Sequence, residues 1–281
     1  AYWRFLRDIL RFNAQGEAVA ATDPAMTVGE LLLRLGTGAW FRDRYILPFS
    51  GAIWSTPTRG ILDFPADAMM RFFRNHALLG YHGQHQWWTV RGGSVEYVRR
   101  LEASLVRAGV EVRTGAPVAA VRRVPGGVHV RAAGAEWEAF DEVVLAVHSD
   151  QAIAILSDAA PEERAALAAI RYQPNEAVLH ADPSLMPRRR RAWASWNYCE
   201  GRGERPERIA LTYWMNSLQP IPKDDPLFVT LNTTRAIRED LIHDVTTFAH
   251  PVYDVPALAA QAAIRGFNGA RGTWCCGAWM R

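Results

Sequence analysis

The sequence has few cysteines, and none of them forms a motif of known redox or metal chemistry. Three cysteines occur, Cys199, Cys275 and Cys276, of which the last two are adjacent, and there is no CxxC pair. This pattern suits a reducing compartment better than a disulfide framework. No charged stretch followed by an apolar run opens the chain, so no secretory signal is predicted. We therefore expect a cytoplasmic protein.

Long apolar runs and a strong net charge are also missing. No apolar run reaches the roughly 18 residues that span a bilayer, so no transmembrane segment is predicted. The formal net charge is +3, from 32 basic and 29 acidic residues spread along the chain, so composition names no partner. With 49% hydrophobic residues among 281, the chain can bury a sizeable core and is long enough for two domains.

Sequence signatures of metal sites and nucleophiles are weak or absent. His82 and His85 have a spacing that a metal could use, but no Asp, Glu or Cys stands close to them, so we expect no metal. No GxSxG motif marks a nucleophilic serine. Cys275 and Cys276 have no adjacent basic residue to activate a thiol, so we expect small buried residues. The run Arg188 to Arg191 has no flanking stacking motif, so a solvated loop is favoured over a nucleic-acid site.

Residues 1 to 79 are predicted to be mainly helical. Apolar residues recur at helical spacing in residues 2 to 12 and 66 to 79. Thr27 with Glu30 three residues later forms a capping box, which predicts a helix start. Residues 40 to 65 mix aromatics, glycines and prolines without a sustained period, which predicts an irregular packed segment.

The rest of the chain predicts an α/β part and an α+β part. Residues 95 to 109 have helical spacing, "VEVRTG" alternates as a short strand, and a meander follows up to the apolar run Val143 to Val147. That run is β-branched and does not alternate, so we expect a strand covered on both faces. Residues 151 to 264 predict a helix followed by an antiparallel sheet rich in aromatic residues.

Five stretches in this order carry a resemblance to a known family. They are "WWTVRGGSVEYVRRL", "GAPVAAVRRVPGGVHV", "FDEVVLAVHSDQA", "FAHPVYD" and "GARGTWCCGAW". Together they resemble the flavin-containing amine oxidase superfamily, and more narrowly bacterial NAD/FAD-binding proteins often encoded beside cyclopropane fatty acid synthases. The resemblance implies FAD as cofactor and a partial Rossmann-like FAD-binding domain interleaved with a mixed helical and antiparallel-sheet substrate domain.

The resemblance assigns segments to these two domains. Residues 80 to 150 and the return strand in residues 265 to 281 are expected in the FAD-binding domain. Residues 1 to 79 and 151 to 264 are expected in the substrate domain. The sequence departs from the family pattern because it contains no GxGxxG loop, which would place the FAD diphosphate on a helix N-terminus. We therefore expect a fragment of a longer protein that is inactive by itself.

The resemblance also implies where FAD would lie. The purely structural interpretation of Gly92 and Gly93 is a strand-to-helix turn that needs positive φ angles. The family places both glycines near the flavin, where the missing Cβ lets backbone approach the cofactor, with Ser94 as a candidate helix cap. Val118 matches the position that meets the adenine with its backbone.

The remaining implied contacts come from the ends of two strands. Ala146 and Val147 match residues that line the nucleotide half of the site, and Trp274 and Gly277 match the strand that enters the flavin end. Trp54 and Tyr253 are candidates to shape a substrate cavity, although structural packing is at least as good an interpretation for each. No catalytic acid or base is predicted, because a flavin supplies the chemistry of C–H oxidation.

Three interpretations remain open. The first is part of an FAD-dependent oxidoreductase that transfers a hydride equivalent from an amine, fatty acyl or isoprenoid substrate to flavin. The second is a non-catalytic module that keeps the fold and binds a lipid or small molecule without cofactor. The third is a nucleic-acid-binding domain centred on Arg188 to Arg191. Peripheral membrane contact and the oligomeric state are left open.

Overall fold

The chain folds into two compact units, each made of two separate stretches of sequence. The structure is a computed structural model that describes residues 2–54, 58–80, 82–83, 85–199 and 210–280. Unit 1 consists of residues 1–101 and 173–250, and unit 2 of residues 102–172 and 251–281. The assignment of residues 80 to 150 and 265 to 281 to a FAD-binding domain stays a prediction.

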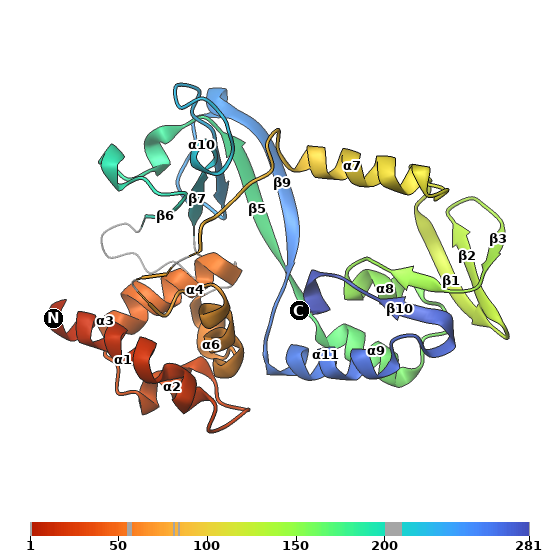
Figure 1. The fold of residues 1–281 in the computed structure, drawn as a ribbon, viewed down its shortest axis with the longest axis horizontal. Coiled ribbons are helices and arrows are strands. Elements are labelled where there is room, and N and C mark those ends of the chain that lie inside the picture. Colours follow the sequence, from red (N-terminus) through yellow and green to blue (C-terminus); the bar gives the residue numbers. More distant parts are fainter. Residues whose placement is uncertain (1, 55–57, 81, 84, 200–209, 281) are drawn as a thin grey trace. The chain divides into compact units, whose positions relative to one another are not determined.

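The first part of unit 1 is a group of helices (Figure 1), and aromatic side chains form much of its core. Phe12, Phe41 and Phe73 are almost fully buried, and the Phe12 ring centroid lies 5.5 Å from that of Phe41 and 6.0 Å from that of Phe73. The helical elements are α1 (Tyr2–Ala20), α2 (Val28–Arg34), α3 (Ala39–Phe41), the π-helix η1 (Arg42–Ile46), α4 (Leu47–Trp54), α5 (Thr58–Leu62) and α6 (Ala66–Asn75).

The start of α2 confirms the predicted capping box. The Thr27 hydroxyl accepts a hydrogen bond from the Glu30 backbone N–H at 3.3 Å, and the Glu30 carboxylate accepts one from the Thr27 N–H at 2.8 Å. The prediction of an irregular segment over residues 40 to 65 was wrong, because α3, η1, α4 and α5 lie there. Helix α4 buries Pro48, Ser50, Gly51, Ala52 and Trp54, so it has no polar face and no periodic signal.

The second part of unit 1 is a five-stranded sheet in the order β6-β7-β8-β5-β9. The pairs β6–β7, β7–β8 and β8–β5 are antiparallel, as predicted. The strands are β5 (Tyr172–His180), β6 (Trp196–Tyr198), β7 (Leu211–Trp214), β8 (Phe228–Leu231) and β9 (Ile242–Pro251), with the short helices η2 (Pro183–Leu185), η3 (Arg190–Ala192), α10 (Met215–Leu218) and η4 (Glu239–Leu241) between them.

A buried chain of hydrogen bonds crosses the centre of this sheet. His180 Nε2 lies 2.7 Å from Thr230 Oγ1, which lies 2.9 Å from Thr212 Oγ1. His180 Nδ1 accepts a hydrogen bond from the Asp182 backbone N–H at 3.1 Å, so the proton of the neutral ring is on Nε2. Burial lowers the pKa of His180, with a further contribution from His243 and an opposing one from Asp182. The ring is therefore held neutral inside the sheet.

Helix α7 (Ser94–Arg107) contributes residues to both units. It confirms the helix predicted for residues 95 to 109, yet none of its residues is buried. Its apolar positions Val95, Val98 and Leu101 are 47%, 57% and 46% exposed. The amphipathic pattern thus predicted the helix correctly, although its apolar face has no cover among the described residues.

Unit 2 contains two small sheets and several helices (Figure 1), and buried residues from both form one core. An antiparallel meander has the order β1-β2-β3, and β10 pairs with β4 in parallel. The elements are β1 (Val118–Val124), β2 (Gly127–Ala132), β3 (Trp137–Phe140), β4 (Val143–Leu145), α8 (Ser149–Ile155), α9 (Pro161–Ala169), α11 (Val255–Phe267), η5 (Ala270–Gly272), β10 (Thr273–Cys275) and η6 (Ala278–Met280). Val121, Leu145, Leu156, Ile264 and Trp279 are among its buried core residues.

Two strand predictions in unit 2 were wrong. Residues 110 to 115 form no strand, because no neighbouring strand pairs with them and Val110 and Val112 stay 46% and 47% exposed. The strand at β4 is not covered on both faces, because Leu145 is buried while Val144 is 60% exposed. An apolar run therefore predicted the strand correctly but not its number of packed faces.

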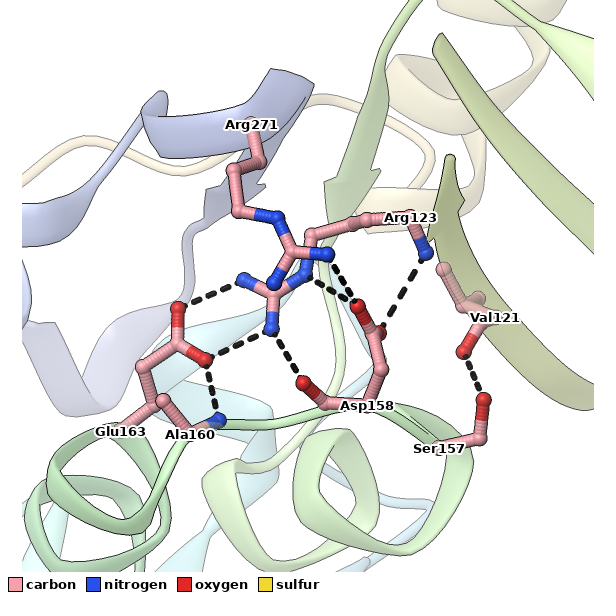
Figure 2. A network of polar contacts seen from close by, with 7 residues as sticks. All are labelled: Val121, Arg123, Ser157, Asp158, Ala160, Glu163 and Arg271. Carbon is pink, nitrogen blue, oxygen red and sulfur yellow. Dashed lines mark hydrogen bonds and ion pairs between the residues drawn. The ribbon is translucent and has the colours of Figure 1, made fainter. Parts of the chain in front are cut away.

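Arg123 joins the meander to the helices through a buried set of ion pairs (Figure 2). Its side chain is 1% exposed. Its two Nη atoms donate to both carboxylate oxygens of Glu163 at 2.6 and 2.7 Å, and its Nε donates to Asp158 at 3.1 Å. Arg271, just before β10, also donates to Asp158 at 2.8 Å. The hydrogen bonds from Arg123 lower the pKa of Glu163, so its carboxylate is held ionised.

Within the described residues, every helix is too short or too polar to cross a bilayer.

We predict that Arg123→Met lowers the free energy of unfolding by about 3 to 5 kcal/mol, because it leaves Glu163 charged, buried and unpaired. The neighbouring Arg122→Met should cost no more than about 1 kcal/mol, since Arg122 is exposed and makes no ion pair among the described residues. It lies over the Trp137 ring at 4.4 Å and hydrogen-bonds His129 Nδ1 at 3.3 Å. Urea denaturation measures both. Adding Glu163→Gln to Arg123→Met should restore stability, so strictly additive losses would contradict the role of this pair.

We also predict that His180 makes stability fall as the pH drops below about 6.5, the pKa of an unfolded histidine. Below this pH the histidine is protonated in the unfolded chain but not in the folded chain. Protonation therefore favours the unfolded state, and the free energy of unfolding decreases. Urea denaturation at several pH values measures the slope of the free energy of unfolding against pH. His180→Gln should reduce the slope, whereas the exposed His243→Gln should retain most of it. An unchanged slope in His180→Gln would contradict this assignment.

Candidate cofactor site

Four of the predicted cofactor residues lie at the ends of the two parallel strands of unit 2. Strand β10 pairs with β4 in the register Thr273 with Val143, Trp274 with Val144 and Cys275 with Leu145. Cys275 and Leu145 are buried in the core of unit 2, whereas Trp274 and Val144 lie on the other face, 39% and 60% exposed. The pair of strands therefore presents a partly exposed apolar face, on which Trp274 Nε1 donates to the Glu142 carboxylate at 3.1 Å.

The segments that follow these strands are tied to each other. Trp279 donates through Nε1 to the Val147 carbonyl at 2.9 Å, and the Cys276 N–H donates to the Leu145 carbonyl at 3.1 Å. A Cβ on Gly277 would lie 2.6 Å from Trp279 Nε1, so a glycine is needed for this packing. The structure thus brings Val147 and Gly277 into one connected segment, with Ala146 exposed beside it.

Tyr253, a predicted substrate residue, lies beside the same segment. Its hydroxyl donates to the Ala278 carbonyl at 2.9 Å. Burial raises the pKa of Tyr253, with a smaller contribution from Tyr172, so the phenol stays protonated at neutral pH. The structure therefore joins Tyr253 to the residues after β10, as a neutral hydrogen-bonding group.

Val118 stands at the first position of β1 and is 43% exposed. The ladder between β1 and β2 is interrupted by a bulge between Val118 and Ala120. A bulge leaves backbone groups without their ladder partners, and backbone groups are what the resemblance assigns to adenine at this position. The local geometry fits that role.

Of the predicted site residues in unit 1, Gly92 and Gly93 form a turn before α7, and Trp54 lies in the core of the helical group. Gly92 and Gly93 have φ angles of 87° and 85°, which confirms the turn with positive φ. A Cβ on Gly92 would lie 2.8 Å from Glu96 Cγ, whereas a Cβ on Gly93 would meet no atom within 4 Å. Ser94 is the first residue of α7, so it is not the residue that precedes the helix as an N-cap would be.

Trp54 is buried at 7% exposure among other aromatic rings. Its ring centroid lies 4.7 Å from that of Phe64 and 4.9 Å from that of Phe72. In this structure it is a core residue of the helical group. Its role at a substrate cavity stays a prediction.

The two adjacent cysteines have different environments. Cys275 is buried and Cys276 is exposed, which corrects the prediction that both are buried. The strand register explains the difference, because Cys275 occupies the inward position opposite Leu145. Burial raises the pKa of Cys275 to about 11, so its thiol stays protonated near neutral pH. Among the residues that the structure describes, no group of three or more His, Cys, Asp or Glu side chains could hold a metal ion.

These features fit part of a flavin nucleotide. Within unit 2, the apolar residues Val144 and Trp274 suit ring contacts, and the bulge at Val118 leaves backbone groups that suit hydrogen bonds. The buried Thr273 hydroxyl has no hydrogen-bond partner among the described residues. The 281 residues contain no GxGxxG loop for a diphosphate.

Comparison with known proteins identifies the family. The sequence matches the family described as flavin containing amine oxidoreductase over residues 30–184, more than half of the chain. The chain belongs to this family. Its members are flavin-dependent oxidoreductases, and the cofactor is FAD. No curated protein matches the sequence.

Solved structures of this fold are similar at low sequence identity. A fatty acid isomerase from P. acnes that produces CLA is 15% identical with a TM-score of 0.63, covering 99% of this chain and 70% of that one. Putrescine oxidase bound to putrescine is 13% identical with a TM-score of 0.63, covering 98% and 70%. Cyclohexylamine oxidase from Brevibacterium oxydans IH-35A is 12% identical with a TM-score of 0.60, covering 98% and 69%. These likenesses establish the fold.

Sequence reasoning missed the residues that position this site. The sequence predicts a strand that contains Arg123, but it does not predict the ion-paired network with Asp158, Glu163 and Arg271. A signal was present, because Val121 and Arg123 share one face of an alternating strand whose other members are apolar. A charged residue in the buried phase of a strand requires a partner of opposite charge.

We predict that Cys276 reacts with a maleimide much faster than Cys275 in the folded chain, because only Cys276 is exposed. Mass spectrometry of tryptic peptides after brief labelling measures the difference, with Cys276→Ser as control. Rapid labelling of Cys275 without unfolding would contradict the strand register at β10.

Proposed function

We propose that the protein oxidises a C–H bond of a small-molecule or lipid substrate with bound FAD. The match to the amine oxidoreductase family over residues 30–184 carries this proposal. Bound FAD would accept a hydride equivalent from the substrate. The protein then needs to orient the substrate and exclude water, which is compatible with the absence of an evident acid or base.

We assign the cofactor contacts to the residues whose local geometry fits them. Gly92 and Gly93 would admit the flavin ring or its side chain, with Ser94 beside it. Val118 would meet the adenine with its backbone. The strand ends would line the nucleotide and the flavin, through Ala146, Val147, Trp274 and Gly277. The exposed apolar faces of Val144 and Trp274 support this assignment.

The substrate class is an amine, a fatty acyl chain or an isoprenoid. The similar structures include an oxidase bound to putrescine and a fatty acid isomerase, so both an amine and a fatty acid are compatible with this fold. Tyr253 is the better placed of the two predicted substrate residues, because its hydroxyl lies at the segment after β10. The three free cysteines support a cytoplasmic location.

The missing diphosphate loop favours one alternative, a module that binds a lipid or small molecule without cofactor. FAD affinity in such folds depends on a glycine-rich turn at a helix N-terminus, where backbone N–H groups meet two negative charges. We therefore expect the 281-residue chain by itself to be inactive and to lose FAD during gel filtration.

We predict that the protein encoded by the gene, with any sequence flanking these residues, retains FAD and that Gly93→Ala reduces this retention at least tenfold. The added methyl group would occupy the open space beside Gly93 and strain a φ of 85°. Gly126→Ala is a matched control, because Gly126 also has φ 85° and open space but lies in the β1–β2 turn. Flavin absorbance after gel filtration, with unfolding measured in parallel, separates cofactor loss from backbone strain of about 1 to 2 kcal/mol.

Equal retention in both glycine variants would contradict the proposed place of Gly93. Failure of the gene-encoded protein to retain FAD at all would contradict the oxidoreductase proposal and favour the cofactor-free binding module.

A further inference from the structure

A cationic cleft lies in unit 1, among residues that the proposed oxidation does not use. It has a volume of about 820 Å³ and is lined by Arg189, Arg190, Arg191, Trp214 and Lys223. The arginines come from the turn at η3, Trp214 ends β7, and Lys223 follows α10. Four cationic side chains from two separate segments thus converge on one hollow.

Two tryptophan rings hold the central arginine in place. The Arg190 guanidinium carbon lies 3.9 Å from the ring centroid of Trp193 and 5.0 Å from that of Trp214. The two rings meet edge to face at 5.4 Å. Trp193 donates through Nε1 to the Pro187 carbonyl at 2.8 Å, which fixes the start of the arginine turn. The guanidinium is therefore ordered without using its own hydrogen-bond donors.

Among the described residues, the cleft has unused donors and little opposing charge. Within the described part of the chain, Arg189, Arg190, Arg191 and Lys223 form no ion pair. The exposed Asp224 and Asp225 adjoin Lys223 in the sequence and do not line the cleft. The buried Nε1–H of Trp214, in the cleft wall, donates to no described acceptor. An anion with several acceptor oxygens would pair with the exposed cationic side chains together.

We propose that this cleft binds the phosphate group of an anionic phospholipid at a membrane surface. Arginine presents a planar set of donors that matches phosphate oxygens, and basic residues beside a membrane attract anionic lipids. The four cations lie around a single hollow, whereas single-stranded nucleic acid is usually bound along a longer basic groove with several stacking rings. The whole chain has a net charge of only +3, so the attraction is local to this cleft.

Vesicle flotation tests this proposal, because bound protein rises with the vesicles while aggregated protein sinks. The 281-residue chain should float with vesicles of phosphatidylcholine and phosphatidylglycerol but not with phosphatidylcholine alone. The triple variant Arg189→Gln, Arg190→Gln, Lys223→Gln should bind about a hundredfold more weakly, from about 1 kcal/mol for each basic residue.

A charge-matched triple variant controls for non-specific attraction. Arg7, Arg91 and Arg100 are exposed, lie in the same unit and are absent from the cleft, so their change to Gln removes the same net charge. This control should retain most of the binding, and circular dichroism should show all variants folded. Arg190→Lys should bind more weakly than the native chain, because it keeps the charge and loses the planar donors.

Three outcomes would overturn the proposal. Equal losses in the two triple variants would mean that total charge and not the cleft decides binding. Saturable binding of inorganic phosphate through the cleft, without flotation, would identify a soluble phosphate ligand. Tighter cleft-dependent binding to single-stranded DNA than to the vesicles would identify a nucleic-acid site. Flavin retention is measured separately, so failure here leaves the proposed oxidation unaffected.

Discussion

The buried guanidinium of Arg123 connects the segments on which unit 2 depends. It joins β1 to Asp158 before α9 and to Glu163 within α9, and Asp158 in turn binds Arg271 before β10 (Figure 2). A buried charge is strongly destabilising unless every partner is present, so these segments fix one another's positions. Ser157 adds a second link, since its hydroxyl donates to the Val121 carbonyl at 2.9 Å.

This connection determines how the candidate cofactor face is presented. Arg271 lies two residues before β10, and β10 pairs with β4 in a single register that turns Trp274 outward and Cys275 inward. A shift of one residue would bury Trp274 and expose Cys275, because side chains alternate along a strand. The Arg123 network, the strand register and the apolar face are therefore consequences of one packing arrangement.

Local signals in the sequence predicted the local structure well. Thr27 and Glu30 identified the start of α2, and Gly92 and Gly93 identified a turn that needs positive φ. Patterns that depend on distant partners were less reliable. Residues 110 to 115 alternate like a strand but have no pairing partner, and α4 has no polar face to give a helical period. The partners of Arg123 lie 35 and 40 residues away, beyond the reach of any local pattern.

For the candidate site, too, local features were predictable from the sequence and packing was not. The sequence identified which residues stand at strand ends and turns, but their exposure depends on packing. Ala146 and Trp274 are accessible, whereas Trp54 is enclosed by Phe64 and Phe72. The cationic cleft was missed for a related reason, because Trp214 and Lys223 come from a segment remote from Arg190. A run of arginines is ordinarily a solvated surface, and only the two rings beside Arg190 distinguish it here.

The central proposal is that FAD lies against the strand ends of unit 2. Hydrogen–deuterium exchange of the gene-encoded protein, with FAD bound and after its removal, tests this most directly. The account predicts that FAD slows exchange at residues 117–119, 144–147 and 274–277, with little change in β6 to β8. A protein that holds FAD while these segments exchange at unchanged rates would contradict it.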